Sequence, residues 1–478
     1  MNRLTVINVV GLTEALIGVR TPAIAAFRRR GALARIAPAF PAVTCTAQSS
    51  YLTGTSPARH GIVGNGWYDR TLAEVQFWKQ SNHLVAGEKI WDALRARLPG
   101  FTCAQLFWWY NMYSGADYSV TPRPLYPADG RKVFDIHTWP PDLRPDLKQD
   151  LGEFPFFGFW GPAAGVKSPA GGPDATSRWI AAAAKWTEEK YKPTLNLVYL
   201  PHLDYNLQRH GPFAPGEPNT SGRPAINPAI VPDLHTIDAI VGDLITYFEN
   251  RGVRVVLLSE YGITNVDRQV ALNRLFRRQG WLAIKDELGR ETLDAGASRV
   301  FAVADHQVAH IYVNDATLLE PARALLRGTA GVERVLGPAE KTAAGIDHPR
   351  AGQLIAVAAE NAWFSYYYWL DDARAPDFAH TVDIHRKPGY DPAELFLDPK
   401  LTLPQLKIAW RLLQKKLGLR MLMDVIPLDA TLVKGSHGRL PADPLDWPVF
   451  LTNQPQHLPA SQMQATEVFA ALQRHVLP

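Results

Sequence analysis

The sequence has little cysteine, little net charge and no long apolar run. Cys45 and Cys103 are its only cysteines in 478 residues, which argues against a secreted disulfide framework and against cysteine-type metal spacing. The net charge is only +4 and the basic residues are scattered, so dedicated nucleic-acid binding is not expected. No run is long enough to cross a membrane, and the apolar start is too short for a signal peptide. We therefore expect a cytoplasmic protein without nucleic-acid or membrane partners.

The remaining composition, 46% hydrophobic and 20% charged, is typical of a globular protein. Predicted strands occupy residues 4–10, 32–37, 195–200 and 253–258. Helices are predicted after Thr21, where Pro22 suits a first helical position, and over about 178–191. Strands that alternate with helices favour an α/β fold, with a mostly parallel sheet between helices. Such sheets bind ligands at the carboxyl ends of their strands.

Two stretches, at about 108–174 and 361–423, interrupt this pattern. They are rich in proline, glycine and aromatic residues, and include FWWYNMY, FPFFGFWGP and WFSYYYWL. We interpret them as insertions that form a cap over the strand ends. Large aromatic side chains bury much apolar area, so they could form the core of the cap or the walls of a ligand site.

The segment from Pro38 to Asn65, PAFPAVTCTAQSSYLTGTSPARHGIVGN, carries the most informative pattern. It is typical of a strand end, a helix that starts at Thr44, a glycine stop and a turn. A helix N-terminus favours an anionic group beside the hydroxyl, and a hydroxyl becomes a good nucleophile once a base or metal activates it. The plain alternative is that Thr44 caps the helix.

Four further segments complete an ordered set of motifs. They are NVVG (8–11), LDYNLQRHGP (203–212), SEYG (259–262) and GSHG (435–438). Together with the Thr44 segment, they resemble the alkaline phosphatase superfamily, in particular its nucleotide pyrophosphatase/phosphodiesterase branch. The resemblance covers about residues 4–452 and implies one domain over residues 1–478. It implies a hydrolase in which Thr44 attacks phosphorus and Asn65 holds phosphoryl oxygens.

The same resemblance implies a divalent-metal cofactor, with zinc as the expected ion. Asp204 and His437 match family ligand positions, and Glu260 keeps a carboxylate where the family has aspartate. As an alternative to ligating a second ion, Glu260 could act as a general base. His437, in its Gly-x-His-Gly motif, is the best matched ligand.

Three other ligand positions depart from the family pattern. Val10 replaces an aspartate, and Gln208 and Tyr261 replace histidines. Valine has no donor atom, and glutamine and tyrosine are poor zinc ligands. Because two-metal chemistry needs both ions as a clamp, the sequence supports one metal site better than two.

Three residues outside these positions could rebuild the site. His210 lies two residues beyond Gln208, and Asp383 and His385 lie in TVDIHRKPGYDP within the second insertion. Residues two apart on an extended segment point to the same side, so this pair could supply ligands. The pair could equally be structural.

Two functions remain open from the sequence. The first is a metal-dependent phosphodiesterase or pyrophosphatase that acts on a small phosphate-containing molecule. The second is an altered family member that serves as a binding or scaffold protein. A sulfatase is disfavoured because CTAQS does not fit the Cys/Ser-x-Pro-x-Arg motif, and a cofactor-independent mutase would have a Ser nucleophile and a fuller metal set. The oligomeric state is left open.

Overall fold

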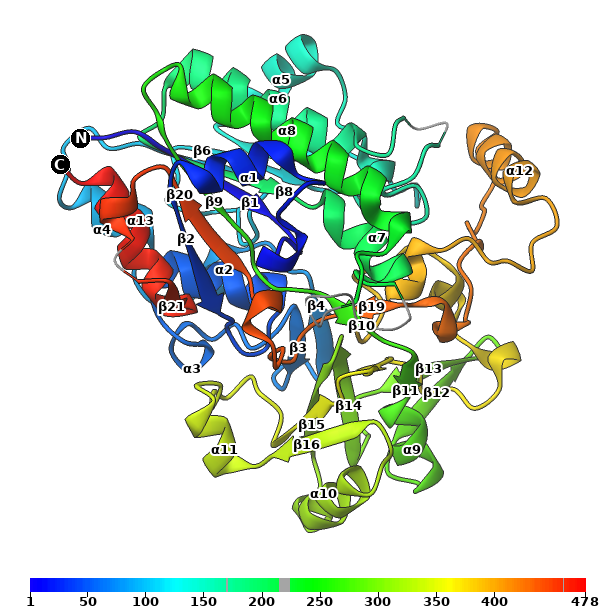
Figure 1. Cartoon of the computed structure of the whole chain (residues 1–478). Helices are drawn as coiled ribbons and strands as arrows, with labels where there is room; N and C mark the ends of the chain where they lie inside the picture. Colours follow the sequence, from blue (N-terminus) through cyan, green and yellow to red (C-terminus); the bar gives the residue numbers. More distant parts are fainter. Residues whose placement is uncertain (169–170, 215–223, 459) are drawn as a thin grey trace.

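The computed structural model describes residues 1–168, 171–214, 224–458 and 460–478, and a nine-stranded sheet forms the centre of this part (Figure 1). Residues 169 and 170 of the predicted first insertion lie outside the described residues. In spatial order the strands are β21 (Gln462–Gln464), β2 (Ala32–Ala37), β20 (Val449–Thr452), β9 (Arg254–Leu258), β1 (Leu4–Val9), β8 (Leu195–Leu200), β5 (Cys103–Leu106), β6 (Tyr118–Pro122) and β7 (Ile136–Trp139). Most neighbouring pairs are parallel; β20 and β7 run antiparallel to their neighbours. The predicted α/β fold is confirmed.

The strands lie within one residue of their predicted bounds because each is a short apolar run. Every residue of β1 and β8 is buried, as expected for central strands covered on both faces. β1 lies between β8 and β9 in parallel register. The carboxyl ends of these three strands therefore meet at one edge, where Val10, Asp204 and Glu260 follow in sequence.

Helices cover both faces of this sheet (Figure 1). The helices are α1 (Pro22–Arg29), α2 (Thr44–Thr53), α3 (Pro57–His60), α4 (Ile90–Arg95), α5 (Leu143–Leu151), α6 (Ala175–Tyr191), α7 (His202–His210), α8 (Val231–Glu249), α9 (Leu272–Arg278), α10 (Leu319–Arg327), α11 (Pro338–Ala343), α12 (Pro404–Lys416) and α13 (Val468–Val476). Helix α8 packs on α1, α6 and α7, whereas α13 packs on α2 and α4. The two groups enclose one large apolar core.

A second, antiparallel sheet lies beside the first. Its order is β14 (Val300–Asp305), β15 (Val308–Val313), β17 (Leu354–Ala358) and β16 (Val332–Leu336). Small two-stranded pairings join β3 (Gly66–Asp69) with β4 (Glu74–Phe77), β10 (Thr264–Asn265) with β19 (Gly435–Ser436), β11 (Arg268–Val270) with β18 (Ala362–Phe364), and β12 (Ala283–Glu287) with β13 (Arg290–Asp294). This sheet has an apolar core of its own, which the sequence analysis did not separate from the main sheet.

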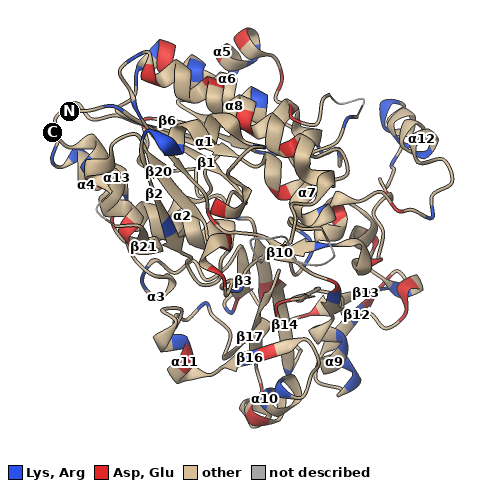
Figure 2. Ribbon diagram, in the orientation of Figure 1, with Lys and Arg blue, Asp and Glu red and all other residues tan. Residues whose placement is uncertain are grey.

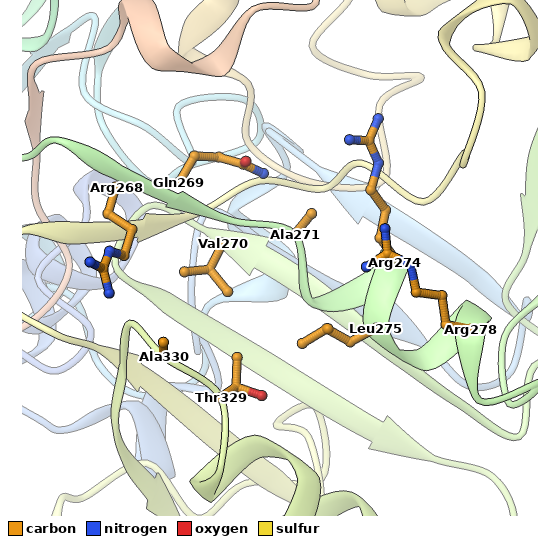
Figure 3. Close-up of a pocket in the computed structure, with 9 residues that line it drawn as sticks. All are labelled: Arg268, Gln269, Val270, Ala271, Arg274, Leu275, Arg278, Thr329 and Ala330. Atoms are coloured by element: carbon orange, nitrogen blue, oxygen red, sulfur yellow. The ribbon is translucent and has the colours of Figure 1, made fainter.

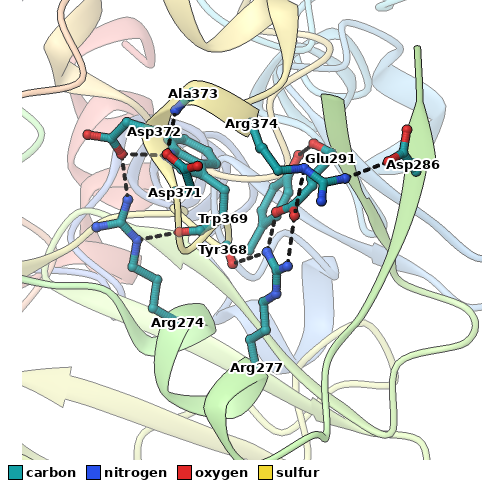
Figure 4. Close-up of polar contacts among 10 residues, drawn as sticks. All are labelled: Arg274, Arg277, Asp286, Glu291, Tyr368, Trp369, Asp371, Asp372, Ala373 and Arg374. Carbon is teal, nitrogen blue, oxygen red and sulfur yellow. Dashed lines mark hydrogen bonds and ion pairs between the residues drawn. The ribbon is translucent and has the colours of Figure 1, made fainter. Parts of the chain in front are cut away.

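Arginines of α9 anchor the start of the second predicted insertion (Figure 4). Arg274 donates to the Trp369 carbonyl at 2.7 Å and to Asp372 at 3.1 Å. Arg277 pairs with the buried Glu291, and these hydrogen bonds hold the pKa of Glu291 below its ordinary value. The aromatic side chains of the WFSYYYWL run therefore belong to the apolar core of the second sheet. Of the two interpretations of these aromatics, core or ligand site, the structure supports the core.

His310 in β15 gives a test of this second core. Its Nε2–H donates to the Val63 carbonyl at 2.9 Å, and its Nδ1 accepts from the Gly352 N–H at 3.1 Å. Burial lowers the pKa of His310 to about 4. Between about pH 6.5 and pH 4, His310 therefore binds a proton in the unfolded chain but stays neutral in the folded chain. The free energy of unfolding should fall by about 1.4 kcal/mol per pH unit between these two pKa values.

Urea unfolding of wild type and His310→Gln across about pH 5 to 7.5 measures this effect. The stability advantage of wild type is expected to be largest above pH 6.5 and to shrink as the pH falls. An advantage that stays constant over this range would show that His310 does not carry the proton linkage.

Candidate active site

Thr44 is the first residue of α2, at the carboxyl edge of the main sheet. Val43, in an extended conformation, takes the N-cap position, and Gly54 ends the helix with a φ of 65°. The Thr44 hydroxyl makes no cap hydrogen bond; it lies 3.3 Å from the Tyr261 hydroxyl. The alternative that Thr44 caps the helix is therefore wrong, because Val43 holds the N-cap position. Only 3% of Thr44 is exposed.

Tyr261 connects Thr44 to Asp204. Its hydroxyl donates to Asp204 Oδ1 at 3.0 Å and lies 3.3 Å from the Thr44 hydroxyl. The other carboxylate oxygen, Oδ2, accepts from Gln208 Nε2 at 2.7 Å. Asp204 and Gln208 are four residues apart on α7 and thus share a face. Burial raises the pKa of Asp204 to about 6, against the lowering effect of both hydrogen bonds.

Glu260 is the second buried carboxyl beside Thr44. Its Oε1 accepts from the side-chain amides of Asn8 at 2.6 Å and Gln48 at 2.5 Å. Burial raises the pKa of Glu260 to about 8, although hydrogen bonds from Gln48, Asn8 and Thr44 oppose the shift. Its Oε2 has no hydrogen-bond partner in the described part of the chain. At neutral pH most of this carboxyl is therefore protonated, and it becomes a proton acceptor beside the Thr44 hydroxyl as the pH rises toward about 8.

Asn65 lies on the other side of the helix start. Its Oδ1 accepts from the Cys45 N–H at 3.0 Å, and its Nδ2 donates to Asp305 Oδ1 at 3.1 Å. The Asn65 N–H donates to Asp305 Oδ2 at 2.8 Å. Burial raises the pKa of Asp305 to about 6. Asn65 therefore caps the first turn of α2 and is oriented by a carboxyl from the second sheet.

Four aromatic rings stack in a column through the site. Successive ring centroids of Tyr261, His437, His306 and Tyr390 lie 3.6, 3.7 and 3.6 Å apart. The Tyr390 hydroxyl donates to Gln208 Oε1 at 2.9 Å, which closes the column back onto Asp204 through Gln208. The second insertion thereby contributes a side chain to the cluster.

His306 reaches the column from the tip of the β14–β15 hairpin. Its φ of 61° is left-handed, a conformation that costs free energy outside glycine and often marks functional sites. The next residue, Gln307, donates its N–H to the His437 carbonyl at 2.8 Å. The second sheet is therefore joined to the GSHG loop at this point.

Both histidines have one nitrogen engaged and one free. His437 Nδ1–H donates to the Ala42 carbonyl at 2.8 Å, and His306 Nδ1 lies 2.8 Å from Asp305 Oδ1. Neither Nε2 has a hydrogen-bond partner among the described residues. Burial lowers the pKa of both imidazoles. The two rings are thus neutral acceptors beside the Thr44 cluster.

Asp305, His306 and Tyr390 are site neighbours that the sequence analysis did not find. A signal was present for the first two, because Asp-His follows the apolar run VFAVA directly, as polar residues follow β8 and β9. Tyr390 lies in the same TVDIHRKPGYDP motif as Asp383 and His385, but it is one of many aromatic residues in the second insertion. Nothing in the sequence distinguishes it.

The structure places three candidate ligands away from Asp204. His210 is exposed at the end of α7, six residues beyond Asp204 and therefore on a different side of the helix. His385 lies in a turn that begins directly after Asp383, and neither residue is in a strand. The Asp383 N–H donates to Glu394 Oε1 at 2.9 Å, and His385 Nδ1 lies 3.3 Å from the Phe77 carbonyl. These contacts join neighbouring parts of the chain, as expected if the pair has a structural role.

The residues present do not fit the two-ion set that the family resemblance implies. Within the described ranges, no three His, Cys, Asp or Glu side chains come together as a group that could hold a metal ion. Both oxygens of Asp204 already accept hydrogen bonds from neutral donors, Tyr261 and Gln208. Val10 is fully buried in the core. His437 keeps a free Nε2, but its ring is stacked on Tyr261 instead of beside a second ligand.

The Thr44 cluster is closed in this structure. Thr44, Glu260 and His437 are almost completely buried. A substrate can therefore reach Thr44 only if residues packed over it move aside. A pocket of about 550 Å³ lies elsewhere, between β11, α9 and the loop at Thr329 (Figure 3). Arg268 lies on one side of it and Arg274 and Arg278 on the other (Figure 3). It contains none of the predicted site residues.

Comparisons with known proteins place the fold. Murine ectonucleotide pyrophosphatase/phosphodiesterase 5, solved in complex with AMP, is 14% identical, with 100% of this chain and 96% of that chain covered and a TM-score of 0.56. Phosphonoacetate hydrolase from Sinorhizobium meliloti, in complex with phosphonoacetate, is 16% identical, with 99% and 96% covered and a TM-score of 0.59. At these identities the likeness concerns the fold. A search among curated protein sequences found no match.

The family follows from the sequence itself. The family described as type I phosphodiesterase / nucleotide pyrophosphatase matches residues 4–391, which is most of the chain. The match includes Thr44, Asn65, Asp204 and Glu260, but ends before His437. The chain therefore belongs to the type I phosphodiesterase / nucleotide pyrophosphatase family and is a hydrolase that acts on phosphate esters.

Proposed function

We propose that the chain hydrolyses a small phosphodiester or pyrophosphate, with Thr44 as the nucleophile. The observation that carries the proposal is the position of the Thr44 hydroxyl at the start of α2, between the Tyr261 hydroxyl and the Glu260 carboxyl. A helix N-terminus stabilises an anionic group. A side-chain base within reach activates a hydroxyl.

The proposed reaction has two steps. In the first, Thr44 Oγ1 bonds to phosphorus, the bond to the leaving group breaks, and Glu260, in its ionised form, takes the Thr44 proton. The leaving oxygen takes a proton from water as it departs. In the second step, water cleaves the phosphothreonine bond and a proton returns to Thr44. Tyr261, held by Asp204, orients the Thr44 hydroxyl for the attack.

The leaving group is proposed to carry a flat apolar part. Tyr390 lies 5.7 Å from Trp160 and 6.3 Å from Trp78, and Trp78 lies 4.8 Å from Trp109, measured between ring centroids. These aromatic residues come from the end of β4 and from the two insertions, and Tyr390 among them reaches Gln208 of the Thr44 cluster. Once the cover opens, they offer stacking surfaces for a base or similar ring.

Trapping of the covalent intermediate tests the proposal. The protein is mixed with a phosphodiester substrate, quenched in acid, digested and analysed by mass spectrometry. The substrate's phosphoryl group is expected on the peptide that contains Thr44. Turnover without any adduct, or an adduct on another residue, would refute the assigned nucleophile.

Chelation is expected to leave turnover unchanged. The sequence predicts a zinc-type ion at Asp204, Glu260 and His437, but no step above runs through one, because neutral donors already satisfy both oxygens of Asp204. The measurement is elemental analysis of protein purified without chelator, together with turnover before and after EDTA. One or two transition ions per chain, with activity lost on chelation and restored by Zn²⁺ or Mn²⁺, would contradict this.

A binding or scaffold role is the second candidate. It is favoured by Val10, Gln208 and Tyr261, which replace ligands without leaving a comparable donor set, and by the closed cover over Thr44. Under this reading the protein holds a phosphate-containing ligand without cleaving it. Absence of turnover over a broad panel of phosphate esters, combined with measurable binding of one of them, would favour it over hydrolysis.

A further inference from the structure

Helix α12 is amphipathic in the opposite sense from a surface helix of a globular protein, which turns its apolar stripe inward. None of its residues is buried. Its large apolar side chains point to solvent: Leu406 is 63% and Trp410 56% exposed. In Figure 1 the helix stands apart from the body of the molecule.

The exposed apolar residues form one stripe. Leu403, Leu406, Trp410, Leu413 and Leu417 are spaced by three and four residues, which places them on one side of a helix. All five are exposed, and Leu419 and Leu422 extend the apolar surface beyond the helix. A contiguous exposed patch of this kind marks an interaction site.

The other side of α12 contacts the protein through half-buried Ile408, which packs against the small apolar cluster of Ala393, Val425 and Ile426, and through polar contacts. Lys407 and Arg411 each lie 2.9 Å from the Asp424 carboxylate. Lys415 donates to the Lys132 carbonyl at 3.2 Å. These contacts fix the rotation of the helix, so the apolar stripe faces outward as a consequence of the fold.

The charge around the stripe has one sign. Residues 399–423 contain no aspartate or glutamate, and their basic residues are Lys400, Lys407, Arg411, Lys415, Lys416 and Arg420. Lys400, Lys416 and Arg420 are exposed, and Figure 2 shows the blue of lysine and arginine on α12. An apolar stripe with a tryptophan, flanked by cations, matches the boundary between acyl chains and anionic headgroups of a bilayer.

We propose that α12 docks the protein on the surface of an anionic lipid bilayer, with the Leu403–Leu417 stripe inserted at the headgroup level. The helix lies in the interface and does not cross it: in the described part of the chain no helix is long and apolar enough to span a membrane. A partner protein groove or a second copy of the chain would use the apolar stripe but would not require a lipid headgroup charge.

Docking would act on the same segment of the chain that reaches the Thr44 cluster. The segment that carries α12 also carries Tyr390, whose hydroxyl donates to Gln208 in the Thr44 cluster. The docking inference itself stands on α12 alone and holds whether or not Thr44 is a nucleophile.

Vesicle flotation of the full chain tests the proposal. Vesicles of phosphatidylcholine with about 30% phosphatidylserine are compared with pure phosphatidylcholine at low and physiological ionic strength. Binding is expected to the anionic vesicles, weaker at higher salt. Trp410→Glu combined with Leu413→Glu should weaken it at least about tenfold, because it removes two apolar side chains that the bilayer would bury. Lys416→Glu combined with Arg420→Glu should remove the preference for anionic lipid.

Leu288→Glu is the matched control, because Leu288 is a fully exposed leucine at the β12–β13 turn, far from α12 in sequence. It should bind vesicles like wild type. Thermal unfolding checks that each variant is folded, which is expected since the substituted side chains are exposed. The proposal is overturned if wild type ignores anionic vesicles at low salt, or if the Trp410/Leu413 variant binds them undiminished. It is also overturned if that variant only changes the oligomeric state, which would identify a second copy as the occupant.

Discussion

Thr44→Ala is expected to lower turnover by about 10³-fold or more, because removal of a nucleophile leaves only the contribution of binding and of the remaining polar groups. The substitution removes one hydroxyl at the first turn of α2. That hydroxyl makes no helix cap, so the helix should persist. Rates toward a phosphodiester, a phosphomonoester and a pyrophosphate give the measurement, with kcat and KM separated.

Two variants of the same helix sharpen this result. Thr44→Ser keeps a hydroxyl and should retain measurable turnover. Thr53→Ala removes a hydroxyl whose partners are the Ser49 carbonyl at 2.7 Å and Thr55 just beyond the end of the same helix, so it should turn over like wild type. If Thr44→Ala hydrolyses all three esters at wild-type rates, the hydroxyl is not the nucleophile.

Lys387→Met is expected to reduce the free energy of unfolding by about 3–5 kcal/mol. Lys387 is almost fully buried, with its Nζ 2.7 Å from Asp391 and 2.8 Å from Glu394. Burial opposes its charge, but the two carboxyls hold its pKa above the ordinary value. Without the ammonium, both carboxyls are left buried without a counter-charge.

The Lys387 cluster also joins the two predicted insertions. Glu394 Oε2 accepts from Trp160 Nε1 at 2.5 Å, and its Oε1 accepts from the Asp383 N–H. Loss of Lys387 should therefore loosen the contact between the two stretches as well as lower the stability. Urea unfolding followed by circular dichroism measures the free energy, and limited proteolysis reports on the insertions.

Arg386→Met serves as the comparison for Lys387→Met. Arg386 is the preceding cation, mostly exposed, and its ion pairs with Asp377 and Asp383 are both 3.9 Å long. Exposed pairs of this kind contribute at most about 1 kcal/mol. Asp391→Asn and Glu394→Gln added to Lys387→Met should recover part of the loss. A Lys387→Met variant as stable as Arg386→Met would show that the buried cluster is not held by its charge.

Local patterns predicted the elements that carry the site well. The apolar runs that became β1, β8 and β9 were found within a residue, because central parallel strands are apolar on both faces. The helix start at Thr44 and its end at Gly54 were found because proline, glycine and the change of period mark them. Asp204 and Glu260 were predicted from the family motifs LDYNLQRHGP and SEYG, which follow two such strands.

The partners of these residues could not be predicted in the same way. That Tyr261 joins Thr44 to Asp204 depends on how a loop after β9 meets the start of α2, more than 200 residues away in sequence. His306 was missed because its hairpin belongs to a second sheet, and an apolar run does not reveal which sheet it joins. The hydrogen bond from Tyr261 to Asp204 has the same origin, since Tyr261 lies on a separate element from α7.

The sequence by itself determined the family, the α/β core and the residues at the strand ends, because these depend on apolar periodicity and on short ordered motifs. Only the tertiary structure decided that those residues form a closed, hydrogen-bonded cluster with His306 and Tyr390. It also decided that α12 turns its apolar stripe to solvent, since the direction of a helix face depends on which side finds partners. Contacts between distant segments are set by packing, and packing leaves no local pattern to read.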